Sequence, residues 1–244
     1  MAGSNQATRS WQSARQPWLW FALALALTAF GFWPSFLSRP GAAPSHILVH
    51  GLSATLWMLL PVVQAVLIRR RQQVWHRQLG YASLALAAVV VITGLRVIQT
   101  MVISEGTAVT TTTWKFVLLD LTGIALFVVV VALAISAAQR RDIGLHLRLM
   151  AVSAIIPLEA ANERTAILLL PGLVPDFSTA LYASLISVEL ICAALIAVDW
   201  HRGRLRWPVP ALLGYYVVMH VIATPIALSP AFQSFGGWYA RIGG

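Results

Sequence analysis

Charged residues are scarce in this sequence. They make up 10% of its 244 residues, whereas about a quarter is usual in a soluble domain. Hydrophobic residues make up 59%, which excludes an ordinary soluble protein. The net charge is +9, but the basic residues lie in short clusters between apolar runs and not on an amphipathic face. The excess of positive charge therefore indicates membrane topology, and nucleic acid is not expected as a partner.

Reactive residue types are also few. The only cysteine, Cys192, lies within an apolar run, which excludes a disulfide framework, a CxxC redox pair and a CxxCH haem-attachment motif. The only lysine, Lys115, lies outside the last apolar run, where a retinal protein needs its Schiff-base lysine. The sequence contains neither a nucleophile elbow nor an HExxH motif, so hydrolase chemistry is not predicted.

Seven apolar runs account for most of the chain. Each is about long enough to cross a bilayer core of roughly 30 Å as a helix, and a helix satisfies its own backbone hydrogen bonds in lipid. The runs cover residues 18–37, 46–69, 79–101, 114–137, 144–170, 180–199 and 209–229. The sequence thus predicts an all-α integral membrane bundle of seven transmembrane helices that forms a single domain, 1–244.

Prolines and the N-terminal region refine this prediction. Kinks are expected at Pro157, Pro210 and Pro225, because a proline within a helix removes a backbone donor. The polar segment 1–16 and the run that follows could be mistaken for a signal peptide. We interpret the run as a retained first helix, because it is long enough to span and no small-x-small cleavage site follows it cleanly.

The distribution of arginine predicts the orientation of the chain. Arginines cluster before the first run and after the second, fourth and sixth, whereas the alternate loops hold little beyond Arg39, Glu105 and Asp176. The positive-inside rule then places the N-terminus in the cytoplasm and the C-terminus outside. Tryptophans near the predicted helix ends agree with an aromatic belt at both membrane surfaces. These are Trp18, Trp20, Trp33, Trp114, Trp200 and Trp207.

Histidines are the first candidate functional residues. Neutral imidazole is a good ligand for haem iron and for transition metals, and helical bundles build such sites from facing helices. Two pairs are permitted by the predicted topology: His76 with His146 near the cytoplasm, and His50 with His220 toward the outer half. His46 and His50, at positions i and i+4, form a further candidate metal site. The alternative is that histidines at helix ends are merely solvated among lipid headgroups, as expected for His201.

Ionisable residues within the apolar runs are the second candidate. Each such group costs roughly 2.5–3.5 kcal/mol at the membrane centre, so these side chains should face one another. They are Arg96, Asp120, Glu159, Glu163, Arg164 and Glu189. Glu159 and Glu163 share a helix face beside Pro157, and Arg164 is expected to reach Asp120 or Glu189. The cluster either lines a polar cavity for a proton, an ion, a quinone head or a haem propionate, or is a structural ion-pair network.

Several short motifs resemble a family of uncharacterised bacterial polytopic membrane proteins. These are Trp33-Pro34-Ser35-Phe36, His50-Gly51 with Trp57 and Gln64, His76-Arg77-Gln78-Leu79-Gly80, His146-Leu147-Arg148-Leu149-Met150 with Arg164 downstream, and Asp199 before a basic loop. The likeness covers roughly residues 30–206. It implies a bacterial inner membrane and this helix count, and it includes His50, His76 and His146 but neither His46 nor His220. The arrangement is also similar to cytochrome b561-type haem proteins, as an architectural analogy only.

Three functions are compatible with these features. The first is a membrane redox protein that binds b-type haem or a transition metal through its histidines and exchanges electrons with a quinone. The second is a proton- or ion-coupled transporter that uses the buried acidic and basic residues. The third is a non-catalytic subunit or assembly factor whose partner is another membrane protein. In each case the lipid bilayer surrounds the chain, and the sequence does not decide whether the protein is an enzyme.

Overall fold

The protein is built from helices, with no strand among the residues that the structure describes. This structure is a computed structural model that describes residues 17–39, 41, 43–106 and 109–242. The N-terminal segment 1–16 of the sequence analysis lies outside the described residues. The elements are α2 (Pro17–Phe32), the π-helical turn η1 (Trp33–Leu37), α3 (Ser45–Arg69), α4 (Gln73–Glu105), α5 (Thr111–Gln139), α6 (Ile143–Ile155), α7 (Leu158–Leu169), α8 (Phe177–His201), α9 (Pro208–Ala227) and α10 (Pro230–Ala240).

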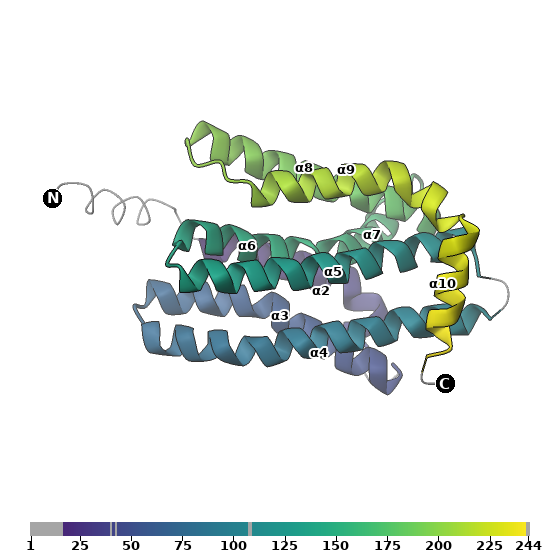
Figure 1. The fold of residues 1–244 in the computed structure, drawn as a ribbon, viewed down its shortest axis with the longest axis horizontal. Helices are drawn as coiled ribbons and strands as arrows, with labels where there is room; N and C mark the ends of the chain where they lie inside the picture. Colours follow the sequence, from purple (N-terminus) through teal and green to yellow (C-terminus); the bar gives the residue numbers. More distant parts are fainter. Residues whose placement is uncertain (1–16, 40, 42, 107–108, 243–244) are drawn as a thin grey trace.

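The long helices run side by side along the longest axis of the molecule. Three antiparallel hairpins, α3–α4, α5–α6 and α8–α9, are visible in Figure 1, with α5 and α6 between the other two. Helix α2 packs against α3 and α7. Helix α10 lies across the bundle, over one end of α4 and α5. The chain is therefore a helical bundle with one short transverse helix.

Six helical segments are long and apolar enough to cross a membrane, and the bent pair α6–α7 brings the number to seven if it counts as one span. All seven predicted apolar runs are helical in the structure, which confirms a multi-pass membrane protein. The fifth run, predicted as one helix, is instead two helices that meet at an angle of 42°. The predicted kink at Pro157 is thus confirmed, whereas α9 continues as one helix through Pro225.

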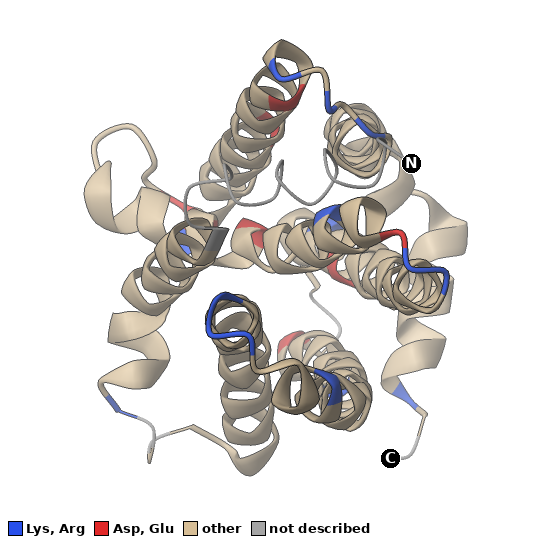
Figure 2. Ribbon diagram, turned by 90° about the vertical axis from the view of Figure 1, so that its left-hand side faces the viewer, with Lys and Arg blue, Asp and Glu red and all other residues tan. Residues whose placement is uncertain are grey.

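All three hairpin turns lie at the same end of the bundle, hereafter the arginine-rich end. Figure 2 looks onto this end and shows basic residues along the turns. Each turn includes a residue with positive φ: Arg71 at 59°, Arg141 at 59° and Gly203 at 60°. A left-handed residue just after a helix is a common way to end it. Arg206 donates to both oxygens of Asp142 at 2.7 Å, and this contact holds the pKa of the Asp142 carboxyl below its usual range.

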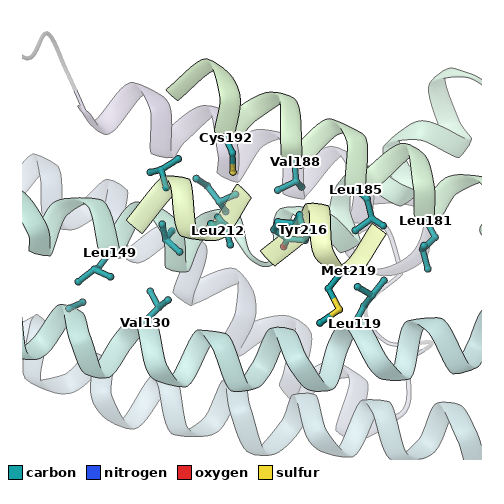
Figure 3. Packing of buried hydrophobic residues seen from close by; sticks show 14 of the residues in the cluster. Leu119, Val130, Leu149, Leu181, Leu185, Val188, Cys192, Leu212, Tyr216 and Met219 are labelled. Atoms are coloured by element: carbon teal, nitrogen blue, oxygen red, sulfur yellow. The ribbon is translucent and has the colours of Figure 1, made fainter. Parts of the chain in front are cut away.

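The largest hydrophobic core lies between α5, α6, α8 and α9. Figure 3 shows Leu149, Val188, Leu212 and Tyr216 among its side chains, contributed by three of these helices. Cys192 is one of its fully buried members. Apolar side chains facing lipid explain why many large hydrophobic residues on the outer helix faces are exposed.

Helix α10 was not among the predicted elements, and it changes the position of one predicted belt tryptophan. Trp20, Trp33, Trp200 and Trp207 are exposed near helix ends, as the aromatic belt requires. Trp114 is instead buried beneath α10, with its ring in edge contact with Phe232. The prediction for Trp114 was wrong because a segment far along the chain covers it.

The close packing of α10 on Trp114 depends on Gly236, which has no side chain. A Cβ added at Gly236 would lie 2.1 Å from a ring carbon of Trp114, so we expect Gly236→Leu to lift α10 from the bundle. Overpacking of this kind costs about 1–3 kcal/mol. Hydrogen exchange measured by mass spectrometry should show faster exchange over residues 230–240. Gly237→Leu is the control, since only Arg241 lies near that position, at 3.9 Å. Equal exchange in both variants would show that the Trp114 contact does not hold α10.

Candidate functional site

A cavity of about 630 Å³ opens at the end of the bundle opposite the arginine-rich end. Its walls come from α4, α5, α7 and the first turn of α8. Five carboxylate residues line it, together with one basic residue, Arg164. The carboxylate residues are Glu105, Asp120, Glu159, Glu163 and Asp176. The cavity is therefore strongly acidic, and we refer to it as the acidic cavity.

The inner wall of the acidic cavity is formed where the fifth span breaks. Helix α6 ends at Ile155 and α7 begins at Leu158, because Pro157 cannot donate a backbone hydrogen bond. At the break, the carbonyl of Ile156 accepts from the Glu159 backbone N–H at 3.4 Å and from the Tyr216 hydroxyl of α9 at 3.3 Å. The break therefore has a hydrogen-bond donor of its own, as irregular backbone within a membrane requires. It places Glu159 in the first turn of α7, beside the cavity.

Two glutamates on α7 are the most deeply buried of the carboxylates. Glu159 and Glu163 are 8% and 4% exposed. Glu159 accepts a hydrogen bond from the Ser184 hydroxyl at 3.0 Å. One turn further, Asn162 donates to the Ser187 hydroxyl at 2.6 Å. These contacts tie α7 to α8. Glu159 and Glu163 both line the acidic cavity, as predicted for residues on one side of a helix.

Arg164 is the only basic residue in the lining, and it is not firmly paired. Its guanidinium lies 3.9 Å from a carboxylate oxygen of Glu163, which is the outer limit for an ion pair. Its Nη1 donates to the carbonyl of Ala160 at 2.7 Å, and the group stacks over the Phe32 ring at 4.5 Å. Asp120, on α5, is partly exposed to the same cavity. Three carboxyl groups within the membrane region thus line one cavity with a single guanidinium, so acidic side chains outnumber basic ones there.

The mouth of the acidic cavity is built from two connections between helices. Glu105 accepts hydrogen bonds from the backbone of Thr110 at 2.8 Å and from the Thr113 hydroxyl, which closes the α4–α5 connection. Asp176 caps α8 by accepting from the Thr179 backbone N–H at 2.8 Å. This hydrogen bond lowers the pKa of the Asp176 carboxyl from its usual value. Both mouth carboxylates therefore also hold the local backbone in place.

Two members of the predicted charged cluster lie elsewhere. Arg96 is exposed on α4 and donates to Gln99, whose amide nitrogen donates to the carbonyl of Tyr239 at 3.0 Å. Glu189 pairs with His220 at 3.2 Å, in the α8–α9 hairpin. Arg164 therefore does not reach Glu189, and the cluster reduces to Asp120, Glu159, Glu163 and Arg164. The sequence could not show this because helix adjacency leaves no local signal.

The fold also determines which of the candidate histidines lie near one another. His50 hydrogen-bonds the Thr93 hydroxyl at 3.1 Å within the α3–α4 hairpin, whereas His220 lies in the α8–α9 hairpin. The α5–α6 layer lies between these hairpins, so the structure does not bring His50 and His220 together. His46 and His50 lie at the start of α3. In the part of the chain that the structure describes, no three His, Cys, Asp or Glu side chains converge as a metal site. His76 and His146 lie in the first turns of α4 and α6, at the arginine-rich end.

A second polar group near the acidic cavity was missed by the sequence analysis. The ammonium of Lys115 donates to the Tyr182 hydroxyl at 3.0 Å, and that hydroxyl is 3.0 Å from the hydroxyl of Thr224. Lys115 is buried although it lies in the first turns of α5. Among the described residues it forms no ion pair, so it does not neutralise the carboxylates of α7.

No protein-family model, curated protein or solved structure matches this chain. The resemblance noted from short motifs therefore stays a prediction. Its residues are not gathered in one place: Gln64, His76 and His146 lie toward the arginine-rich end, whereas Arg164 lines the acidic cavity near the opposite end.

Proposed function

We propose that this protein is a proton-coupled transporter of small organic cations, and that its binding site is the acidic cavity. The observation that carries the proposal is the excess of carboxylates over basic groups: Asp120, Glu159 and Glu163 face a single guanidinium. An unpaired charge within a membrane is costly. Each excess carboxylate must therefore be neutralised, either by a proton or by a bound cation.

This choice between two neutralising partners is the basis for coupling. A proton and an organic cation that bind the same carboxylates exclude each other, so a gradient of one can drive movement of the other. A metal ion is a poorer candidate, because the carboxylates do not converge on one point in the described residues. A cavity of about 630 Å³ is within the roughly 300–1,000 Å³ range of small-molecule sites. The discontinuous span beside it is a feature of many transporter binding sites.

The orientation of the chain is part of the proposal. The arginine-rich end carries the turns after Arg69, Gln139 and His201, and the positive-inside rule assigns such turns to the cytoplasm. The acidic cavity then opens to the outside of a bacterial inner membrane, with the C-terminus on that side. A cation would enter from the outside and reach Glu159 through the mouth formed by Glu105 and Asp176.

Binding of tetraethylammonium to the detergent-purified chain tests the proposal. Its permanent charge does not titrate, so any dependence on pH comes from the protein. We expect calorimetry to give weaker binding as pH falls, because protons occupy the carboxylates. Glu163→Gln should weaken binding roughly 10- to 100-fold, since a contact with a charged group contributes about 1.5–3 kcal/mol.

Two controls make this experiment decisive. Glu189→Gln removes a carboxylate that lies outside the cavity and pairs with His220, so it should leave binding unchanged. Tetraethylmethane, the neutral isostere of tetraethylammonium, should not compete. If a neutral compound such as a soluble quinone analogue bound more tightly than the cation, or if binding were insensitive to pH, the proposal would be wrong.

A further inference from the structure

A second cluster of polar side chains lies inside the bundle toward the arginine-rich end, away from the acidic cavity. His76 is in the first turn of α4 and His146 in the first turn of α6. One turn further along each helix, Leu79 and Met150 pack in the same hydrophobic cluster. Residues three and four apart share a helix face, so the faces that carry the two imidazoles are both directed toward this cluster.

The hydrogen bond of His146 determines which of its ring nitrogens is free. Its Nδ1 lies 2.9 Å from the carbonyl oxygen of Ala134, and a carbonyl can only accept. Nδ1 therefore carries the hydrogen, and in the neutral ring Nε2 carries the lone pair. A ring oriented by a backbone carbonyl in this way is typical of histidines that bind metals.

His76 on α4 and two side chains on α3 carry buried polar atoms without a hydrogen-bond partner among the described residues. They are Nδ1 of His76, Oε1 of Gln64 and Nε1 of Trp57. The amide nitrogen of Gln64 donates to the carbonyl of His76 at 3.2 Å, which holds the Gln64 side chain beside the histidine. Trp57 is 2% exposed. Each unsatisfied buried group costs about 1–3 kcal/mol, so three together indicate a missing binding partner.

We propose that this cluster is a transition-metal site in which His76 and His146 supply imidazole nitrogens and Gln64 supplies an amide oxygen. Two neutral imidazoles suit zinc, copper, iron or nickel, either as a free ion or as the iron of a haem. The site is independent of the acidic cavity.

Cobalt binding to the full chain tests this site. The protein is purified in detergent without a polyhistidine tag, stripped of metal with a chelator and titrated with Co²⁺, whose visible spectrum reports nitrogen ligands. We expect one bound ion per chain. His76→Ala and His146→Ala should each weaken binding at least about 100-fold, because even residues outside the ligand shell alter affinity about 10- to 100-fold. His201→Ala, in an exposed position at the end of α8, should have no effect.

A parallel titration with haem distinguishes the two sources of metal. A Soret shift that requires both His76 and His146 would assign the site to haem iron, and a cobalt spectrum without haem binding would assign it to a free ion. Circular dichroism and the thermal midpoint establish that each variant is folded, and His76→Gln serves as a second variant if the alanine form is not. The proposal is overturned if the folded, unaltered chain binds neither ligand, or if the double variant binds as well as the unaltered chain.

Discussion

Vesicles reconstituted with Glu159→Gln should take up tetraethylammonium roughly 10- to 100-fold more slowly than vesicles with the unaltered chain, when a pH gradient drives uptake. Glutamine keeps the size of the side chain and its ability to accept from Ser184, which lies 3.0 Å from Glu159. It removes the negative charge that a cation and a proton would share. The loss of one charged contact, about 1.5–3 kcal/mol, gives this range.

The matched control is again a carboxylate within the membrane region. Glu189→Gln alters the pair with His220 in the α8–α9 hairpin and leaves the acidic cavity intact. Both variants are compared for helicity and monodispersity in detergent before reconstitution. Uptake that survives in Glu159→Gln but is lost in Glu189→Gln would move the transport path from the acidic cavity to the α8–α9 hairpin.

Gly31→Leu should destabilise the protein by about 3 kcal/mol, the upper part of the usual range for overpacking. A Cβ at this position of α2 would lie 2.4 Å from the carbonyl oxygen of Ala161 and 2.9 Å from the hydroxyl of Thr165, both on α7. The first obstacle is backbone, which cannot rotate away as a side chain can. We therefore expect α2 and α7 to separate and the thermal midpoint in detergent to fall by several degrees.

Gly214→Leu is the control, because nothing lies within 4 Å of the corresponding Cβ on α9. Both substitutions replace a helical glycine by leucine, so they have the same effect on helix propensity. Gly31→Leu should also weaken tetraethylammonium binding, since α7 carries Glu159 and Glu163. Equal stability of the two variants would mean that the close α2–α7 contact contributes nothing to the fold.

Features that depend on local sequence were predictable. The apolar runs gave the helices because a spanning segment must satisfy its own backbone, and Pro157 gave the break because it lacks a donor. The spacing of Glu159 and Glu163 predicted that they share a face, because residues four positions apart lie on the same side of a helix. Each of these features depends on residues within a few positions of one another.

Features that depend on the partners of each helix were not predictable. Arg96 was expected in the buried cluster, yet Gln99 binds it and in turn bonds the carbonyl of Tyr239, 140 residues further along the chain. Trp114 was expected at the membrane surface, yet α10 covers it. Glu189 was expected near Arg164, yet it pairs with His220. No periodicity or motif in one sequence indicates which of seven similar apolar runs will be neighbours.

The break at Pro157 divides the fifth span into two mechanically different parts. Helix α6 is anchored in the large hydrophobic core through Leu149, Val152 and Ile155, and it packs mainly on α5. Helix α7 packs mainly on α2 and α8, through small residues such as Gly31 and Ala161. A tilt of α7 about Pro157 would therefore carry Glu159 and Glu163 with it and leave the core unchanged. The wall that carries the two glutamates can therefore change its angle at Pro157 while α6 stays fixed in the hydrophobic core.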